Sequence, residues 1–304
     1  MAAVVALVLA LSNYDAGSAA RLDETPSVAV LHIEGTISDE RSVSLYQPVT
    51  YNHQYILDTL EQLIADENNL GLLLYIDSPG GGVLQTAEIG ELLQQYKEQT
   101  GRPVYAYGHD YAASGGYWLA SYADQFIANS YCLTGSIGVI MGTMLDVSGF
   151  LAEHGIVATT LASGEEKDMG SNFEPLSEET RAIFMSIINE YYDDFVSVVA
   201  ENRGMSVAQV RELADGRVYT ARQAVANGLA DQVGDYQQAR QAICEALGVE
   251  EEALRDYQYL YQPNVLDFFY SLSNRQNSEV EALMQLAMPF KGPAVYYDIQ
   301  ADQD

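Results

Sequence analysis

Apolar and polar residues alternate along the chain in blocks that predict strands and helices in turn. Continuous apolar runs at residues 28–33 and 70–76 have the length and composition of strands that are covered on both faces. Between them, residues 53–66 carry an apolar stripe at helical spacing. Strands and helices that alternate in this way are typical of an α/β domain with a mostly parallel sheet.

The alternation continues through most of the chain and divides it into three regions. Further elements are predicted as helices at 83–99, 114–120 and 176–202, helix–turn segments over 206–248, and strands at 103–107, 125–128, 137–141 and 156–161. Beyond residue 250 the pattern gives way to a tail rich in Tyr and Asp. We therefore expect an N-terminal segment over 1–26, an α/β domain with a helical C-terminal part over 27–248, and an interface or regulatory tail over 249–304.

The N-terminal segment begins with an uninterrupted apolar run over residues 1–11, shorter than the ~20 residues that span a bilayer. Three interpretations fit it: the stump of a transmembrane anchor, a signal peptide with an Ala-rich site near residues 18–20, or a buried strand. Residues 12–26 turn polar, as a juxtamembrane linker does, and favour the anchor. A membrane-anchored protein with an extracytoplasmic domain is the resulting expectation.

Composition excludes some classes of function. The sequence has 43 acidic and 14 basic residues, and its net charge of -29 repels nucleic acid and anionic membrane surfaces. Its two cysteines, Cys132 and Cys244, are too few for a disulfide framework, and its four histidines lack the spacing of metal ligands. We expect no nucleic-acid partner, no metal and two buried free thiols.

A glycine-rich turn follows the predicted strand at 70–76, where residues 78–82 read Ser-Pro-Gly-Gly-Gly. Glycines leave backbone N–H groups uncovered near the start of the next helix, where an anion or an oxyanion can be held. A turn that only reverses the chain fits the same residues. No G-x-x-x-x-G-K-[ST] motif follows, which disfavours a phosphate-binding loop.

Ser114 is the candidate nucleophile, in the segment 112–118 that reads Ala-Ala-Ser-Gly-Gly-Tyr-Trp between a predicted strand and a predicted helix. A serine at the first turn of a helix, flanked by small residues, presents its hydroxyl to a cleft, and the N–H of Gly115 can donate to an oxyanion. A helix N-cap is the alternative role for Ser114.

Lys167 is the candidate base and one of only three lysines in the chain. A lysine acts as a base only where burial or a cationic neighbour removes its proton. Its acidic neighbours Glu165, Glu166 and Asp168 act in the opposite direction, so they must turn away if Lys167 is catalytic. A solvated loop lysine is the alternative.

Taken in order, these segments resemble the motifs of the signal peptide peptidase A (SppA) family of serine peptidases, in its short single-repeat form. Two more segments carry the resemblance, Thr-Gly-Ser-Ile-Gly-Val at 134–139 and Ala-Asp-Gly-Arg-Val-Tyr at 214–219. The resemblance covers about residues 27–245. It implies a ClpP/crotonase-like α/β fold with a mostly parallel sheet and flanking helices.

The same resemblance assigns roles to the residues. Ser114 would be the nucleophile and Lys167 the general base of a Ser–Lys dyad, with Ser136 orienting the lysine amine, and no cofactor is needed. The oxyanion N–H groups would come from Gly80 or Gly81 and from Gly115. The implied substrates are hydrophobic signal peptide remnants or other extracytoplasmic polypeptides, and the implied assembly is a ring-like homo-oligomer.

Two features depart from the family pattern and three alternatives stay open. His109-Asp110 precedes the nucleophile, and residues 171–175 follow the lysine motif with an unusual composition. His109 with Asp110 or Asp77 could form a Ser-His-Asp site instead. A crotonase-type acyl-CoA hydratase or isomerase shares the paired N–H groups but needs carboxylates in the cleft, and a non-catalytic scaffold needs neither.

Overall fold

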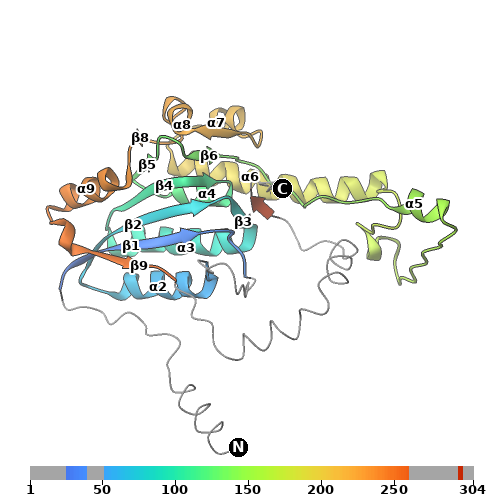
Figure 1. Cartoon of the computed structure of the whole chain (residues 1–304), viewed down its shortest axis with the longest axis horizontal. Helices are drawn as coiled ribbons and strands as arrows, with labels where there is room; N and C mark the ends of the chain where they lie inside the picture. Colours follow the sequence, from blue (N-terminus) through green and yellow to red (C-terminus); the bar gives the residue numbers. More distant parts are fainter. Residues whose placement is uncertain (1–24, 40–50, 260–293, 297–304) are drawn as a thin grey trace, which may run out of the picture.

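The computed structural model describes residues 25–39, 51–259 and 294–296, and its centre is an eight-stranded sheet in the order β7-β6-β4-β2-β1-β9, with β5 paired to β4 and β8 paired to β5 (Figure 1). The strands are β1 Ser27–Glu34, β2 Asn69–Ser78, β4 Val104–Ala113, β5 Gln125–Ala128, β6 Leu133–Gly135, β7 Val218–Thr220, β8 Gln232–Val233 and β9 Leu254–Tyr257. All neighbouring pairs are parallel except β6 with β7. The predicted α/β architecture with a mostly parallel sheet is confirmed.

Helices cover the sheet on both faces and produce two apolar clusters. The larger cluster joins one face of the sheet to α2 His53–Ala65, α3 Val83–Thr100, α4 Gly115–Ser121 and the C-terminal part of α6 Glu178–Asn202. The smaller cluster packs α9 Tyr236–Leu247 on the opposite face. Alternate residues of β1 enter different clusters, as expected for a strand buried on both sides.

The C-terminal end of α6 is fastened to the sheet by a two-pronged ion pair. Arg203 Nη1 and Nη2 lie 2.9 and 2.7 Å from the carboxylate oxygens of Asp231. The same carboxylate accepts the N–H of Phe126 in β5 at 2.7 Å, and Trp118 of α4 stacks on Phe195 of α6. This end of α6 therefore has a fixed position relative to α4.

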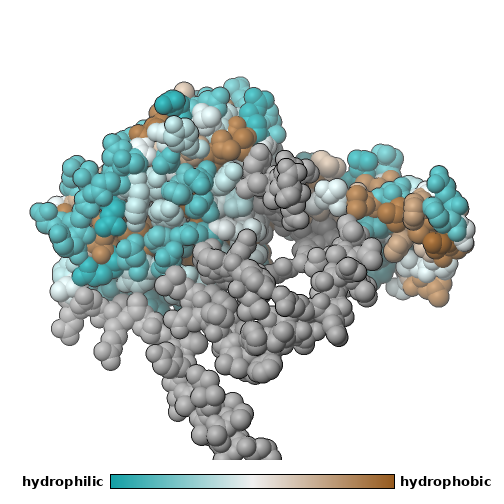
Figure 2. Space-filling view, in the orientation of Figure 1, coloured by the Kyte–Doolittle hydropathy of each residue, from teal (hydrophilic) through white to brown (hydrophobic). Residues whose placement is uncertain are grey.

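The chain before α6 forms a projection that we call the arm, residues 142–177, which extends away from the sheet together with the N-terminal part of α6 (Figure 1). The arm contains α5 Ser148–Glu153 and a short 3-10 helix, η1 Glu165–Asp168. Seven of its large apolar side chains are exposed, and Figure 2 shows a brown region around α5. They are Leu145, Phe150, Ile156, Val157, Leu161, Met169 and Phe173.

Several sequence predictions need correction. Residues 156–161 form no strand, because they lie in the arm, where no neighbouring strand is available to pair with them. Residues 137–141 form no strand either: the strand lies earlier, as β6, and ends because Gly135 and Ser136 both have positive φ (78° and 52°). The sheet also extends past residue 248, since β9 pairs with β1 inside the expected tail.

Two further expectations concern the N-terminal apolar run and the two cysteines. The apolar run over 1–11 lies outside the described residues, and none of the helices in the described ranges has the length and apolar character needed to cross a membrane. Cys132 and Cys244 are both buried free thiols, as predicted. Burial raises the pKa of the Cys132 thiol to about 12, which makes that cysteine an unreactive core residue.

Candidate active site

Ser114 lies on a sharp turn between β4, which ends at Ala113, and α4, which begins at Gly115. Its backbone has φ 53° and ψ −117°, and only Ser136 shares a positive φ among the described non-glycine residues. Such a conformation is costly for a side chain with a Cβ and is found chiefly at functional sites. The turn is the strand–elbow–helix geometry that exposes a nucleophile to a substrate.

The side chain of Ser114 makes no structural hydrogen bond. Ser114 is 1% exposed, its Oγ has no hydrogen-bond partner, and it does not cap α4. Buried hydroxyls without a partner are rare and costly, so each one calls for an explanation. A side-chain N-cap role for Ser114 is therefore excluded. The remaining interpretation is that this hydroxyl is kept free to react with a substrate.

Small residues make the elbow possible. A Cβ on Gly116 would lie 2.7 Å from the carbonyl oxygen of Ser78, so α4 can approach the glycine turn only with glycine at that position. The N–H of Ser114 donates to the carbonyl of Gly135 at 2.7 Å, which ties the elbow to the end of β6. The first N–H groups of α4, including that of Gly115, have no acceptor within the helix.

The glycine turn forms a short strand, β3 Gly80–Gly82, beside α4. Ser78 Oγ donates to the carbonyl of Gly35 at 2.6 Å and accepts the N–H of Gly80 at 3.1 Å. Ile37 donates to Gly80 O at 2.9 Å and accepts from Gly82 N at 2.8 Å. Gly80 and Gly82 have thus committed their N–H groups, which leaves Gly81 as the N–H donor turned the other way.

Gly81 cannot be replaced by a larger residue without displacing the chain. A Cβ there would lie 1.9 Å from the carbonyl oxygen of Ile37. The bracing by Ser78 and Ile37 could not be read from the sequence motif, because Ile37 is far from the turn along the chain. The Ser-Pro-Gly-Gly signal pointed to the turn but not to which glycine turns its N–H away from Ile37.

Ser136 follows β6 immediately and is brought to the same edge of the sheet as Ser114. It is buried, its N–H donates to Arg217 O at 2.9 Å, and its Oγ lies 3.3 Å from Gly216 O. Both serines therefore follow the ends of neighbouring strands, and both have a positive φ. The hydroxyl of Ser136 makes only this long bond, so it can accept a hydrogen bond from another group.

Lys167 lies elsewhere, in η1 of the arm, and is exposed. The adjacent Glu166 accepts a hydrogen bond from Thr180 Oγ1 at 3.0 Å, near the N-terminal end of α6. Along α6, Thr180 is about 22 Å from Phe195, which stacks on Trp118 of α4. Within one chain, Lys167 makes no hydrogen bond to Ser114, because Ser114 Oγ has no hydrogen-bond partner, and the carboxylate of Glu166 is bonded to Thr180.

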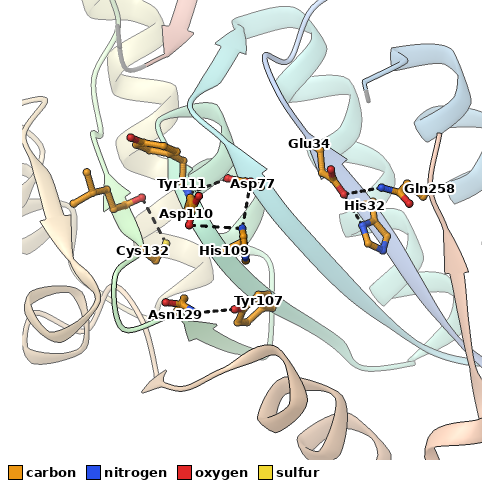
Figure 3. A network of polar contacts seen from close by, with 11 residues as sticks. His32, Glu34, Asp77, Tyr107, His109, Asp110, Tyr111, Asn129, Cys132 and Gln258 are labelled. Atoms are coloured by element: carbon orange, nitrogen blue, oxygen red, sulfur yellow. Dashed lines mark hydrogen bonds and ion pairs between the residues drawn. The ribbon is translucent and has the colours of Figure 1, made fainter. Parts of the chain in front are cut away.

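The position of His109 argues against the Ser-His-Asp alternative. Figure 3 shows His109 directed toward Asp77 and Asp110, with its Nδ1 3.3 Å from Asp77 Oδ2 and 3.7 Å from Asp110 Oδ1. Its ring stacks on Tyr75 at 5.5 Å. Tyr107 of the same cluster contacts Tyr236 of α9, so His109 belongs to the sheet face opposite α4 and does not serve Ser114 as a base.

The carboxylates near the turn are engaged in that same cluster. Asp77 Oδ1 accepts the N–H of Tyr111 at 3.1 Å, while its other oxygen faces His109. The ligand atoms of Asp77, His109 and Asp110 lie within 4.8 Å of one another, but the histidine and the carboxylates already pair among themselves. The carboxylate that crotonase-type chemistry would require beside the N–H donors is therefore not supplied by Asp77.

Comparisons with known proteins agree with this geometry. The sequence profile of peptidase family S49 matches residues 96–250, and that of the Clp protease matches residues 27–136. The chain belongs to peptidase family S49. The match over 96–250 contains the elbow of Ser114, Ser136 and the arm with Lys167, and the match over 27–136 contains the glycine turn.

Individual relatives extend the family assignment across most of the chain. It is 36% identical over 76% of its length to an Enterococcus faecium protein provisionally named signal peptide peptidase SppA, and the match spans 66% of that relative. It is 33% identical over 70% of its length to Protease 4 of Haemophilus influenzae and 28% identical over 70% to the chloroplastic serine protease SPPA of Arabidopsis thaliana. The chain spans only 33% and 31% of those two relatives.

Proposed function

We propose that this protein is a serine endopeptidase that hydrolyses extended polypeptides, with Ser114 as the nucleophile and Lys167 as the general base. The observation that carries the proposal is the free, buried Oγ of Ser114 on a strained elbow beside a glycine turn. Membership of peptidase family S49 supports the same reaction class. The arrangement needs no cofactor, because attack, proton transfer and oxyanion binding are all assigned to groups of the chain.

The reaction would proceed in two halves. Lys167 takes the proton of Ser114 while Oγ attacks the peptide carbonyl, and the oxyanion is held by the N–H groups of Gly81 and Gly115. The C–N bond then breaks, the amine leaves with the proton, and an acyl-enzyme remains. Water, deprotonated by Lys167, attacks the ester and releases the acid and Ser114.

We propose that a second copy of the chain supplies the base, because Ser114 Oγ has no hydrogen-bond partner within the single chain. Exposed apolar side chains of the arm, among them Val157 at 86% and Leu161 at 95%, give a surface that a neighbouring copy would cover. Docking of that arm over the elbow would enclose Lys167 and present its amine to Ser136. A ring-like homo-oligomer satisfies this requirement for every copy at once.

The substrate side of the proposal rests on β3. Its outward edge can accept an extended backbone as an added strand, a mode that reads the main chain and tolerates many sequences. Hydrophobic signal peptide remnants and other extracytoplasmic polypeptides are extended chains of this kind, and one relative is provisionally named a signal peptide peptidase. A membrane anchor in residues 1–11, holding the domain outside the cytoplasm, is part of the same proposal.

Labelling with a fluorophosphonate probe tests the nucleophile. Wild-type protein should be labelled and should hydrolyse a fluorogenic apolar peptide, whereas Ser114→Ala should do neither. Labelling retained in Ser114→Ala would contradict the assignment. An unlabelled wild-type protein with acyl-CoA hydratase activity would favour the crotonase alternative, and one with no activity would favour the scaffold.

Mixing tests the origin of the base. Ser114→Ala and Lys167→Ala chains should each be inactive and should regain activity when they are dissociated and reassembled together. Lys97→Ala is the matched control, because Lys97 is bound to Asp124 at 2.8 Å on the body of the domain and should leave hydrolysis unchanged. Persistent inactivity of reassembled mixed oligomers would contradict a base supplied by a second copy.

A further inference from the structure

A strand from the C-terminal end of the same chain lies against the glycine turn. Residues Ala294–Tyr296 form β10, which pairs antiparallel with β3 and also contacts α4 (Figure 1, red arrow). Ala294 lies opposite Gly82, Val295 opposite Gly81 and Tyr296 opposite Gly80. β10 thus lies along the edge of β3 on which the proposed substrate would bind.

The register determines which backbone groups meet. Gly80 O and Gly82 N are bound to Ile37 on one side of β3, so strand alternation turns the N–H and C=O of Gly81 to the other side, toward Val295. Directly opposed residues of this type exchange both hydrogen bonds. Val295 therefore takes the N–H of Gly81, which is the same donor assigned above to the oxyanion.

We infer that residues 294–296 are a tethered occupant of the substrate's place on β3, so that the chain restrains its own peptidase site until this strand is displaced. The inference rests on the proposed function. Residues 260–293 connect β9 to β10, and at ~3.3 Å per residue a connection of that length covers far more than one domain. Pairing within the chain is therefore compatible with its reach.

The activity test compares peptide hydrolysis by three proteins: the full chain, a chain that ends at residue 259, and the full chain with Val295→Pro. A chain that ends at residue 259 keeps every strand of the central sheet and should hydrolyse the substrate with a kcat/KM about 3- to 10-fold higher, since a tethered strand competes at an effective concentration near millimolar. Val295→Pro in the full chain removes the paired N–H and should give the same increase. Equal kcat/KM for all three proteins would overturn the inference.

A synthetic peptide of residues 291–299 tests the register. Added to the chain that ends at 259, it should raise KM without changing kcat. N-methylation at Val295 should abolish this competition, whereas N-methylation at Tyr296, whose N–H turns away from β3, should leave it intact. Competition that is equal for both methylated peptides, or absent for the unmodified one, would contradict strand pairing at Gly81.

A failure of the peptidase assignment can be distinguished from a failure of the tethered-strand inference. Fluorophosphonate labelling of Ser114 in all three proteins, without any difference in hydrolysis, would leave the peptidase assignment and reject the tethered strand. If no protein is labelled, anisotropy of the fluorescent 291–299 peptide on the Ser114→Ala chain ending at 259 still measures occupancy. Saturable binding there, lost on N-methylation at Val295, supports the strand, and its absence overturns it.

Discussion

The region around Ser114 and the arm that carries Lys167 differ in construction. Around Ser114, strands β4 and β6, helix α4 and the turn of β3 are packed so closely that Gly81 and Gly116 cannot accept a Cβ without a shift. In the arm, apolar side chains as large as Phe150 and Leu161 are exposed. The first region is closely packed within one chain. The second exposes an apolar surface of the kind that a partner usually covers.

Replacing Ser114 by alanine should produce the largest effect and should act only on chemistry. Hydrolysis should fall by a factor of about 10⁴ or more, because a covalent mechanism loses its nucleophile. The free energy of unfolding should not fall, and should rise by up to ~1 kcal/mol, because a buried hydroxyl without a partner is removed. A stopped peptide assay and urea unfolding measure the two quantities; a destabilised variant would show that Oγ has a structural role.

Glycine substitutions compare the two regions directly. Gly81→Ala should reduce kcat by about 10²–10³, because a Cβ 1.9 Å from Ile37 O displaces an oxyanion donor, and should cost ~1–3 kcal/mol of stability. Gly149→Ala in α5 meets nothing within 4 Å and should leave hydrolysis unchanged. Equal losses in both variants would mean that the turn is no more constrained than the arm.

A charge placed on the arm should weaken the oligomer, and hydrolysis should fall as a result. Leu161→Glu should lower the oligomeric mass in analytical ultracentrifugation and reduce hydrolysis about tenfold or more, since a charge buried at an interface costs several kcal/mol. Tyr131→Glu is the control, because Tyr131 is 90% exposed on the body of the domain. Unchanged mass and rate for Leu161→Glu would show that this part of the arm is not an interface.

The smallest expected effect is on the free energy of unfolding. It compares the ion pairs at the two ends of α6 and depends on pH. Burial raises the pKa of the Asp231 carboxyl, but the bonds from Arg203 and from Phe126 N–H outweigh it and hold the pKa below its usual value. The pair therefore stabilises the fold above the unfolded pKa of ~3.9, and this stabilisation is lost as pH falls through the folded pKa.

Asp231→Asn should lower the free energy of unfolding at pH 7 by ~1–2 kcal/mol, a figure reduced for the partial exposure of Asp231, and should flatten the acid limb of stability against pH. Glu178→Gln, at the arm end of α6, removes an exposed pair with Arg181 and should change neither. Urea titrations from pH 3 to pH 7 measure the free energy of unfolding of each variant. If this free energy falls equally with acid in wild type and in Asp231→Asn, the carboxylate of Asp231 does not carry the pH dependence.

The sequence predicted the fold best where one periodicity was strong. The apolar runs of β1 and β2 and the stripe of α2 were found within a residue or two, because burial on one or both faces leaves a clear pattern. β9 was missed because four residues carry little periodicity. The strand predicted at 156–161 failed because its apolar residues are exposed in the arm, where local pattern cannot distinguish a core strand from an apolar surface.

For the site, the motifs located residues but could not supply long-range contacts. The segment around Ser114 indicated an elbow, and the structure adds the free Oγ and the positive φ. The bracing of Gly80 by Ser78, which singles out Gly81, depends on contacts with residues 35 and 37 that no local pattern encodes. The absence of a bonding partner for Ser114 Oγ within the chain was equally beyond a motif.

The exposed position of Lys167 has a kinetic consequence under the proposed function. A newly made chain would carry a nucleophile without its base, and so could not digest the proteins around it before assembly. In the dilute regime, where single chains predominate, the rate of hydrolysis would rise at least with the square of the protein concentration. Local abundance at a surface, rather than synthesis alone, would then set when proteolysis begins.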